Sequence, residues 1–168
     1  MKKTSPSQHK PNESNGREMD KNLCDYQETW EKIVDKGFQD YSSLTGPERV
    51  WFNVESLISM VSNGGLCSYF CEDTVTHVFD TITDLKLLGA NDIVVLLEKM
   101  NSLFPNGQPS EDIDDRMEIM GTWEEHDQLL EALDDEFFEK DEALENALVD
   151  YILENKLAAP AENSVMSI

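Results

Sequence analysis

The sequence is poor in basic residues and has no long apolar run. Its 168 residues include 13 Lys and Arg against 35 Asp and Glu, which gives a formal charge of −22 at pH 7. Phosphate groups attract Lys and Arg, so we expect no direct binding to nucleic acid or to an anionic membrane surface. No apolar run approaches the roughly 20 residues of a membrane span, and the polar residues 6–10 stand where a signal peptide needs its apolar stretch. We therefore expect a soluble, cytoplasmic protein.

Cysteines and catalytic motifs are also scarce. Cys24, Cys67 and Cys71 are an odd number with no CxxC among them, so the sequence predicts neither a disulfide framework nor a zinc site. The chain has no GxSxG, GxxxxGK[ST], GxGxxG or HExxH motif. We expect no enzymatic activity and no cofactor.

Charge and composition divide the chain into three parts. Residues 1–21 are polar, carry a net charge of +2 and lack aromatic side chains, which predicts a disordered tail. Residues 22–155 form the expected folded domain, and residues 156–168 are expected to be a loose C-terminal tail. Within the domain, residues 111–154 contain 18 acids and only two bases, so the negative charge is concentrated there.

Apolar residues recur at helical spacing almost throughout the domain, and no segment alternates apolar and polar residues as strands do. The sequence therefore predicts an all-α, single compact domain of about six to seven helices. The expected helices span about residues 23–41, 46–63, 73–88, 91–104, 123–138 and 141–155, with a short turn at 66–71 and a weak helix at 115–120. The expected core includes Val50, Val54, Leu57, Val78, Phe79, Leu97, Leu133, Phe137 and Leu148.

The helix expected after residue 45 has the clearest signals at both ends. Thr45 stands at the cap position, Pro47 in the first turn and Glu48 at the third helical position, which together predict a capping box. Gly64 and Gly65 end the helix, because glycine readily takes the left-handed conformation of a helix C-terminus.

One row of side chains could hold a metal ion. Its members are spaced to share one face of the helix at 73–88, and they are Asp73, His77, Asp80 and Asp84. Carboxylates around a histidine can ligate a divalent metal, but the same row fits a solvent-exposed face with Asp73 at the helix cap. The same two alternatives apply to His126. We favour the solvent-exposed face and expect no metal.

The acidic residues near the C-terminus are the main functional clue. On the helix expected after Trp123, the residues Leu130, Leu133 and Phe137 share one side. The carboxylates expected outside or at the boundary, here and on the last helix, are Glu124, Asp127, Glu131, Asp135, Glu142 and Glu145. A net charge of about 2–8 keeps a small domain soluble, and this domain exceeds it severalfold. The surface therefore predicts a basic protein partner, with solubility alone as the alternative. Asp73, Asp80 and Asp84 form a second candidate face.

Several segments resemble those of one bacterial protein family. They are residues 44–51 (LTGPERVW), 61–66 (VSNGGL), 103–105 (LFP), 133–138 (LDDEFF) and 148–152 (LVDYI). These segments resemble the DNA-mimic protein 19 family, and the resemblance covers about residues 22–155. It implies an acidic, all-helical, dimeric protein whose surface imitates DNA and occupies the DNA-binding surface of a transcription factor.

The expected homodimer directs attention to exposed aromatic residues. Phe52 projects opposite Val50, Val54 and Leu57 on its helix, where a monomer has little use for an aromatic ring. Phe52, with Trp51 or Trp123, is therefore a candidate dimer contact.

Two classes of function remain open from the sequence. The first is a DNA mimic that sequesters a basic DNA-binding protein, either a transcription factor or a nucleoid protein. The second is an immunity-like or adaptor protein that inhibits a basic enzyme such as a nuclease.

Overall fold

The computed structural model describes residues 22–159, which form α-helices (α) and short 3₁₀-helices (η) and contain no strand. The elements are η1 Leu23–Tyr26, α1 Gln27–Gln39, η2 Tyr41–Ser43, α2 Gly46–Gly64, α3 Leu66–Phe70, η3 Asp73–His77, α4 Val78–Leu87, α5 Asn91–Ser102, η4 Pro105–Gly107, α6 Ile113–Met120, η5 Trp123–His126 and α7 Asp127–Glu154. The predicted all-α class is confirmed. The expected disordered tail 1–21, and residues 160–168 of the expected C-terminal tail, lie outside the described residues.

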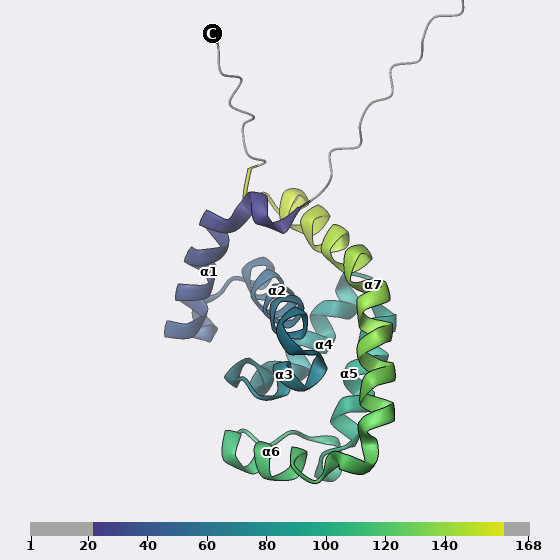
Figure 1. The fold of residues 1–168 in the computed structure, drawn as a ribbon. Helices are drawn as coiled ribbons and strands as arrows, with labels where there is room; N and C mark the ends of the chain where they lie inside the picture. Colours follow the sequence, from purple (N-terminus) through teal and green to yellow (C-terminus); the bar gives the residue numbers. More distant parts are fainter. Residues whose placement is uncertain (1–21, 160–168) are drawn as a thin grey trace, which may run out of the picture.

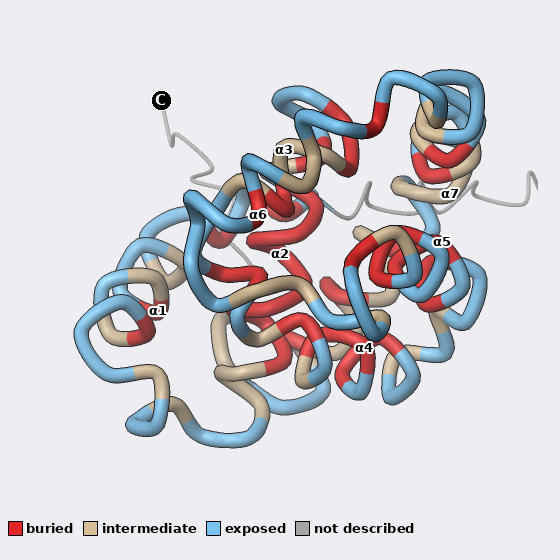
Figure 2. The backbone as a smooth tube through the Cα atoms, turned by 90° about the horizontal axis from the view of Figure 1, so that it is seen from below, coloured by how far each residue is buried: buried red, intermediate tan, exposed pale blue. Residues whose placement is uncertain are grey.

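Helix α2 lies at the centre of the molecule, with α1 on one side and the long α7 on the other (Figure 1). Every residue from 50 to 58 is buried, so α2 is covered on all sides (Figure 2). Most residues of this stretch are apolar, and its buried polar side chains Asn53 and Glu55 bond to Asp84 and to the Trp51 indole inside the protein. Neither α2 nor any other helix within residues 22–159 combines the length and the apolar character that crossing a bilayer requires.

The capping box at the start of α2 is confirmed. The Thr45 side chain accepts a hydrogen bond from the Glu48 amide at 3.3 Å, and the Glu48 carboxylate accepts one from the Thr45 amide at 2.9 Å. Glu48 also receives the Lys36 ammonium of α1 at 2.6 Å, and this bond holds the pKa of Glu48 below its usual value. One carboxylate therefore starts α2 and ties α1 to it.

Gly65 does more than end α2. Its φ of +78° is the left-handed value that favours glycine. A Cβ atom at this position would overlap the Asp134 carboxylate, which accepts a hydrogen bond from the Leu66 amide at 2.7 Å. The glycine therefore lets α7 dock onto the first turn of α3.

The structure corrects the prediction that residues 123–155 form two helices. They form η5 and then one continuous α7, because nothing between Phe138 and Asp141 can break a helix.

Most of the expected core is buried, but Phe79 is 52% exposed. Val78, Ile82 and Leu85 keep their expected inward positions, but the buried face of α4 extends from them in the direction away from Phe79. As a result Thr81 and Asp84 point inward from α4, and Phe79 points to solvent.

The three candidate dimer contacts are also corrected. Phe52 is only 2% exposed, and Trp51 and Trp123 are buried as well. Helix α1 and η2 cover Phe52, whose ring meets those of Phe38 and Tyr41 edge-on at 5.6 and 5.9 Å. A single helical wheel shows one inward face of α2 and gives no sign that α1 covers the other.

Candidate functional site

Helix α7 and the preceding η5 carry the row of carboxylates expected from the sequence. We call these residues the acidic face: Glu124, Asp127, Glu131, Asp135, Glu142 and Glu145. The first five are exposed and Glu145 is half-buried. With 3.6 residues per turn, the members within α7 fall in a sector of about 80° and extend over about 27 Å. Because α7 is a single helix, the carboxylates keep fixed positions relative to one another.

The two bases within residues 111–154 are directed away from the acidic face. Arg116 of α6 is fully buried and donates hydrogen bonds to four backbone carbonyl groups. The acceptors belong to Phe70 at 3.0 Å, Glu72 at 3.2 Å, Ser110 at 2.7 Å and Glu111 at 3.0 Å. Lys140 of α7 turns toward α5, where its ammonium lies 3.3 Å from the Asp92 carboxylate.

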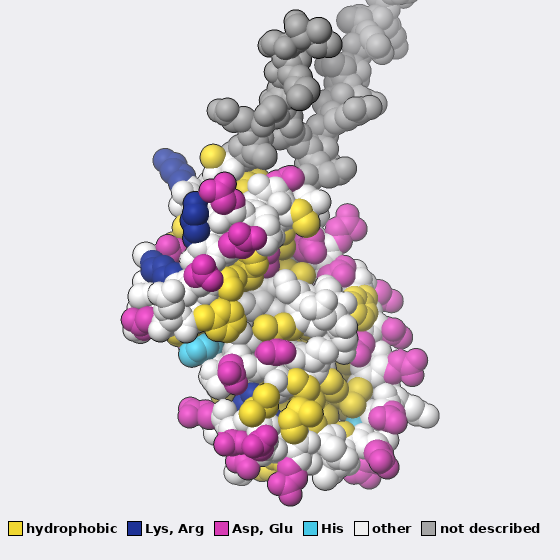
Figure 3. All heavy atoms as spheres, turned by 60° about the vertical axis from the view of Figure 1, so that its left-hand side comes forward, with side chains coloured by type: hydrophobic (Ala, Val, Ile, Leu, Met, Phe, Trp, Pro, Cys, Tyr) yellow, Lys and Arg dark blue, Asp and Glu magenta, His cyan; other side chains and the backbone are white. Residues whose placement is uncertain are grey.

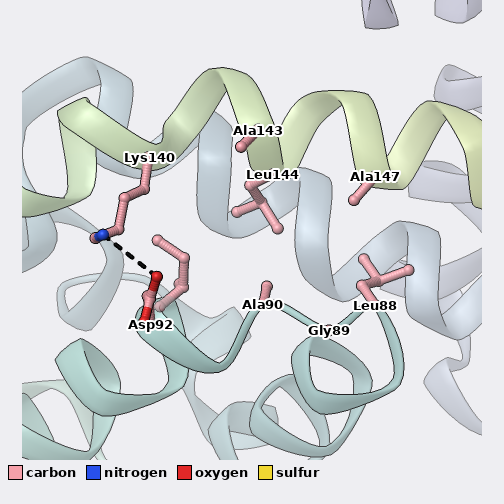
Figure 4. A pocket seen from close by; sticks show the side chains of 9 residues that line it. Leu88, Gly89, Ala90, Asp92, Lys140, Ala143, Leu144 and Ala147 are labelled. Atoms are coloured by element: carbon pink, nitrogen blue, oxygen red, sulfur yellow. Dashed lines mark hydrogen bonds and ion pairs between the residues drawn. The ribbon is translucent and has the colours of Figure 1, made fainter.

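Lys140 and Asp92 stand at one side of a cavity of about 200 Å³ beneath α7 (Figure 4). Small and apolar side chains from α7 and from the turn between α4 and α5 line the rest of it.

Within residues 22–159, no side chain makes a hydrogen bond or salt bridge to Glu131, Asp135 or Glu142. The acidic face thus presents carboxylates that the fold itself does not neutralise.

The second candidate face is not a surface row. Asp84 is only 1% exposed, so it cannot belong to a docking face. Its carboxylate accepts two hydrogen bonds from the Arg49 guanidinium, at 2.7 and 3.3 Å, and one from the Asn53 amide at 2.8 Å. Asp84 therefore joins α4 to α2 inside the protein.

The other members of that row have separate structural contacts. Asp80 accepts a hydrogen bond from the Tyr41 hydroxyl at 3.0 Å, and burial raises the pKa of that hydroxyl. The His77 ring stacks on Tyr41 with centroids 3.5 Å apart, and burial lowers the pKa of His77. Asp73 is exposed at the start of η3. No group of three His, Cys, Asp or Glu side chains within residues 22–159 is placed to hold a metal ion.

Sequence reasoning missed one buried carboxyl group. Glu55 of α2 is 6% exposed and accepts a hydrogen bond from the Trp51 indole. Burial, with a smaller contribution from the charge of Glu145, raises the pKa of Glu55 to about 7. Burial and the neighbouring acids Asp141 and Glu142 also raise the pKa of Glu145. The available signal was the position of Glu55, four residues after Trp51 and within a mostly apolar stretch of α2.

Comparison with known families identifies the family of the chain. The family model described as DMP19-like protein matches residues 42–155, which include α2 to α7. The chain belongs to the DMP19-like family. No curated protein and no solved structure matched the chain.

Helix α1 lies outside the residues that match the DMP19-like model. It nevertheless buries Phe52 and supplies Lys36 to the capping box of α2. The acidic face lies entirely within the matched residues, so the binding surface proposed below belongs to the part of the chain shared with the DMP19-like family.

Proposed function

We propose that this DMP19-like protein is a DNA mimic that regulates transcription or nucleoid structure. Its acidic face occupies the DNA-binding surface of a basic protein and so prevents that protein from binding DNA. The observation that carries the proposal is the row of carboxylates on one continuous helix, with the nearby bases Arg116 and Lys140 both directed elsewhere.

The spacing of these carboxylates supports mimicry. Residues four apart on a helix, such as Glu131 and Asp135, rise about 6 Å along its axis. Duplex DNA places a charge about every 3.4 Å of axis on each strand, so both surfaces repeat negative charge on a similar scale. A field of this strength also steers a basic partner and speeds association at low ionic strength.

Competition with DNA tests the proposal directly. The immobilised protein captures basic partners from a cytosolic extract, because the sequence predicts a cytoplasmic protein, and salt steps elute them. We expect a DNA-binding protein that duplex DNA displaces. A partner that binds both DNA and this protein at once, without loss of affinity for either, would exclude mimicry. A captured enzyme that DNA does not displace from this protein would favour the inhibitor or adaptor function.

A matched pair of variants then locates the surface. The double change Glu131→Gln with Asp135→Asn removes two charges from the acidic face. The control, Glu31→Gln with Asp35→Asn, removes the same two residue types at the same spacing from exposed positions of α1. Loss of two charge contacts on the acidic face should weaken binding roughly tenfold at low salt. The control should retain wild-type affinity; equal losses would mean that only total charge matters.

We also propose that the protein forms a homodimer, as the family resemblance implies. Phe52, Trp51 and Trp123 cannot provide the contact in this fold, because all three are buried. Two chains of like charge repel, so association should tighten as salt screens them. Sedimentation that shows a monomer at every salt concentration would exclude the dimer.

A further inference from the structure

A groove with an apolar floor lies close to the start of the acidic face. It runs between the end of α5 with η4 on one side and α6 with η5 on the other, and its volume is about 540 Å³. We call it the α5–α6 groove. Its apolar lining includes Leu103, Phe104, Ile119 and Trp123, and its acidic lining is Glu118 and Glu125.

The floor of this groove is firmly held. The ring of Phe104 packs edge-on against Trp123 with centroids 4.9 Å apart, and it stacks on Phe70 at 5.5 Å. Both Phe104 and Trp123 are buried in the core, whereas Leu103 and Ile119 are only half-buried. The groove therefore offers an apolar site whose shape the core fixes.

The surroundings of the groove are strongly acidic. Helix α6, which forms one wall, exposes Met117 to 49% and carries Asp114, Asp115 and Glu118, with Asp112 at its N-cap. Its one base, Arg116, points into the protein. Figure 3 shows hydrophobic side chains gathered toward the end of the molecule that carries α6, with acidic side chains around them. An occupant must therefore bring both an apolar side chain and positive charge.

This requirement decides between the possible occupants. A second copy of this chain would bring more carboxylates to a surface that already repels them. Duplex DNA would bring phosphate charge and no apolar side chain, so it does not fit the groove as an occupant. Mimicry of DNA by itself therefore does not explain an apolar groove. A basic amphipathic helix has both features, since it carries Lys and Arg beside Leu, Ile or Phe.

We propose that the α5–α6 groove binds an apolar side chain on a cationic helix of the partner, next to the basic residues that meet the acidic face. The proposal rests on the proposed function and adds partner selection to it. Charge attracts many basic proteins, whereas an anchor in a formed pocket selects those with an apolar side chain at the right place.

Two synthetic cationic helical peptides provide the probe. They share one sequence of Lys, Arg and Ala, except that one peptide carries Leu at a single central position. Burying a leucine side chain should make that peptide bind the wild-type protein about tenfold more tightly. The ratio should persist as salt rises, although both peptides bind more weakly, because apolar burial is not screened.

A groove-filling variant tests the location. Thr122 lines the groove, is exposed, and donates its hydroxyl to the Ile119 carbonyl at 2.7 Å. Thr122→Trp should remove the preference for leucine. The control Thr76→Trp adds the same ring at an exposed threonine that donates to the Asp73 carbonyl at 2.8 Å and does not line the groove. It should keep the preference, and circular dichroism confirms that both variants fold.

Three outcomes would overturn this proposal. In the first, the two peptides bind the wild type equally. In the second, the preference for the leucine peptide survives in Thr122→Trp. In the third, the wild type is a dimer without a preference for leucine, and Thr122→Trp is a monomer. The last result would assign the groove to a second copy. Failure of the proposed function is separate, because it appears as a natural partner that DNA does not displace. The acidic-face variant Glu131→Gln with Asp135→Asn should weaken both peptides equally and leave the ratio unchanged.

Discussion

Carboxylates have different roles on the two sides of α2. Around α1, α2 and α4 they are bound into the fold: Glu48 meets Lys36 and a helix cap, and Asp84 meets Arg49 and Asn53. On α7 the members of the acidic face remain at the surface, and the only lysine of that helix, Lys140, pairs with Asp92 of α5.

The placement of the few bases makes the difference. A carboxylate that faces a base or a buried amide contributes to folding, and its removal leaves a charge or a donor without its partner. A carboxylate on the acidic face contributes a field and little stability. The two groups should therefore respond very differently to the same substitution.

The largest expected effect is at Asp84. Asp84→Ala leaves the buried Asn53 amide without one acceptor and Arg49 without its bidentate partner. We expect a loss of about 3 kcal/mol in the free energy of unfolding, measured by urea denaturation, which is the lower end for a buried pair because Arg49 is 36% exposed. The control Asp135→Ala on α7 should change it by about 0.5 kcal/mol or less. Similar losses in the two variants would remove the distinction between the two regions.

Glu55 should make stability depend on pH. Its pKa is about 7 in the folded protein and 4.5 in a model peptide, so the folded state binds the extra proton between these values. Stability should therefore be greatest below pH 4.5 as far as this group is concerned, and fall as pH rises toward 7. The free energy of unfolding that is lost when Glu55 ionises is about 3 kcal/mol.

The variant Glu55→Gln tests this origin. Glutamine stays neutral and its carbonyl can still accept the hydrogen bond from the Trp51 indole. Urea denaturation between pH 4.5 and pH 7 should therefore show a flatter profile for the variant than for the wild type. Parallel profiles would place the titrating group elsewhere.

A smaller effect is expected at the α2 cap. Thr45→Ala removes the acceptor for the Glu48 amide and should cost about 1 kcal/mol. Thr45→Ser keeps a hydroxyl at that position and should retain most of the stability. Thermal unfolding followed by circular dichroism measures both, and an alanine variant as stable as the wild type would mean that Lys36 alone holds Glu48 in place.

The sequence predicted features that depend on neighbouring residues in the chain. The capping box at Thr45 and the exposed carboxylates of α7 follow from spacing alone, and both occur as expected. Features that depend on distant elements were missed. Phe52 is buried because α1 folds over it, and Asp84 is buried because Arg49 and Asn53 of α2 face it.

The candidate site shows the same division. Helical spacing placed Glu131 and Asp135 on one outer face, but it could not show that Lys140 pairs with Asp92 or that Arg116 is buried. Nor could it show the α5–α6 groove, whose walls come from segments about 15 residues apart in the chain. One error was avoidable, since no breaker interrupts α7.

The smallest expected effect on stability concerns the acidic face itself. Glu131 and Asp135 are four residues apart, so their charges repel by a few tenths of a kcal/mol in the folded helix. Glu131→Gln with Asp135→Asn should therefore raise the free energy of unfolding by about 0.5 kcal/mol at low salt. At about 1 M salt the screening length is about 3 Å, and the difference from the wild type should vanish. In the control, Glu31→Gln with Asp35→Asn, the gain should be smaller, because Lys32 and Lys36, which pair with Glu28 and Glu48, leave α1 much less negative than α7. Urea denaturation at both salt concentrations measures these changes. Destabilisation by more than about 1 kcal/mol in the α7 variant would show that its carboxylates hold the fold together, and a surface with that structural task would not be free to imitate DNA.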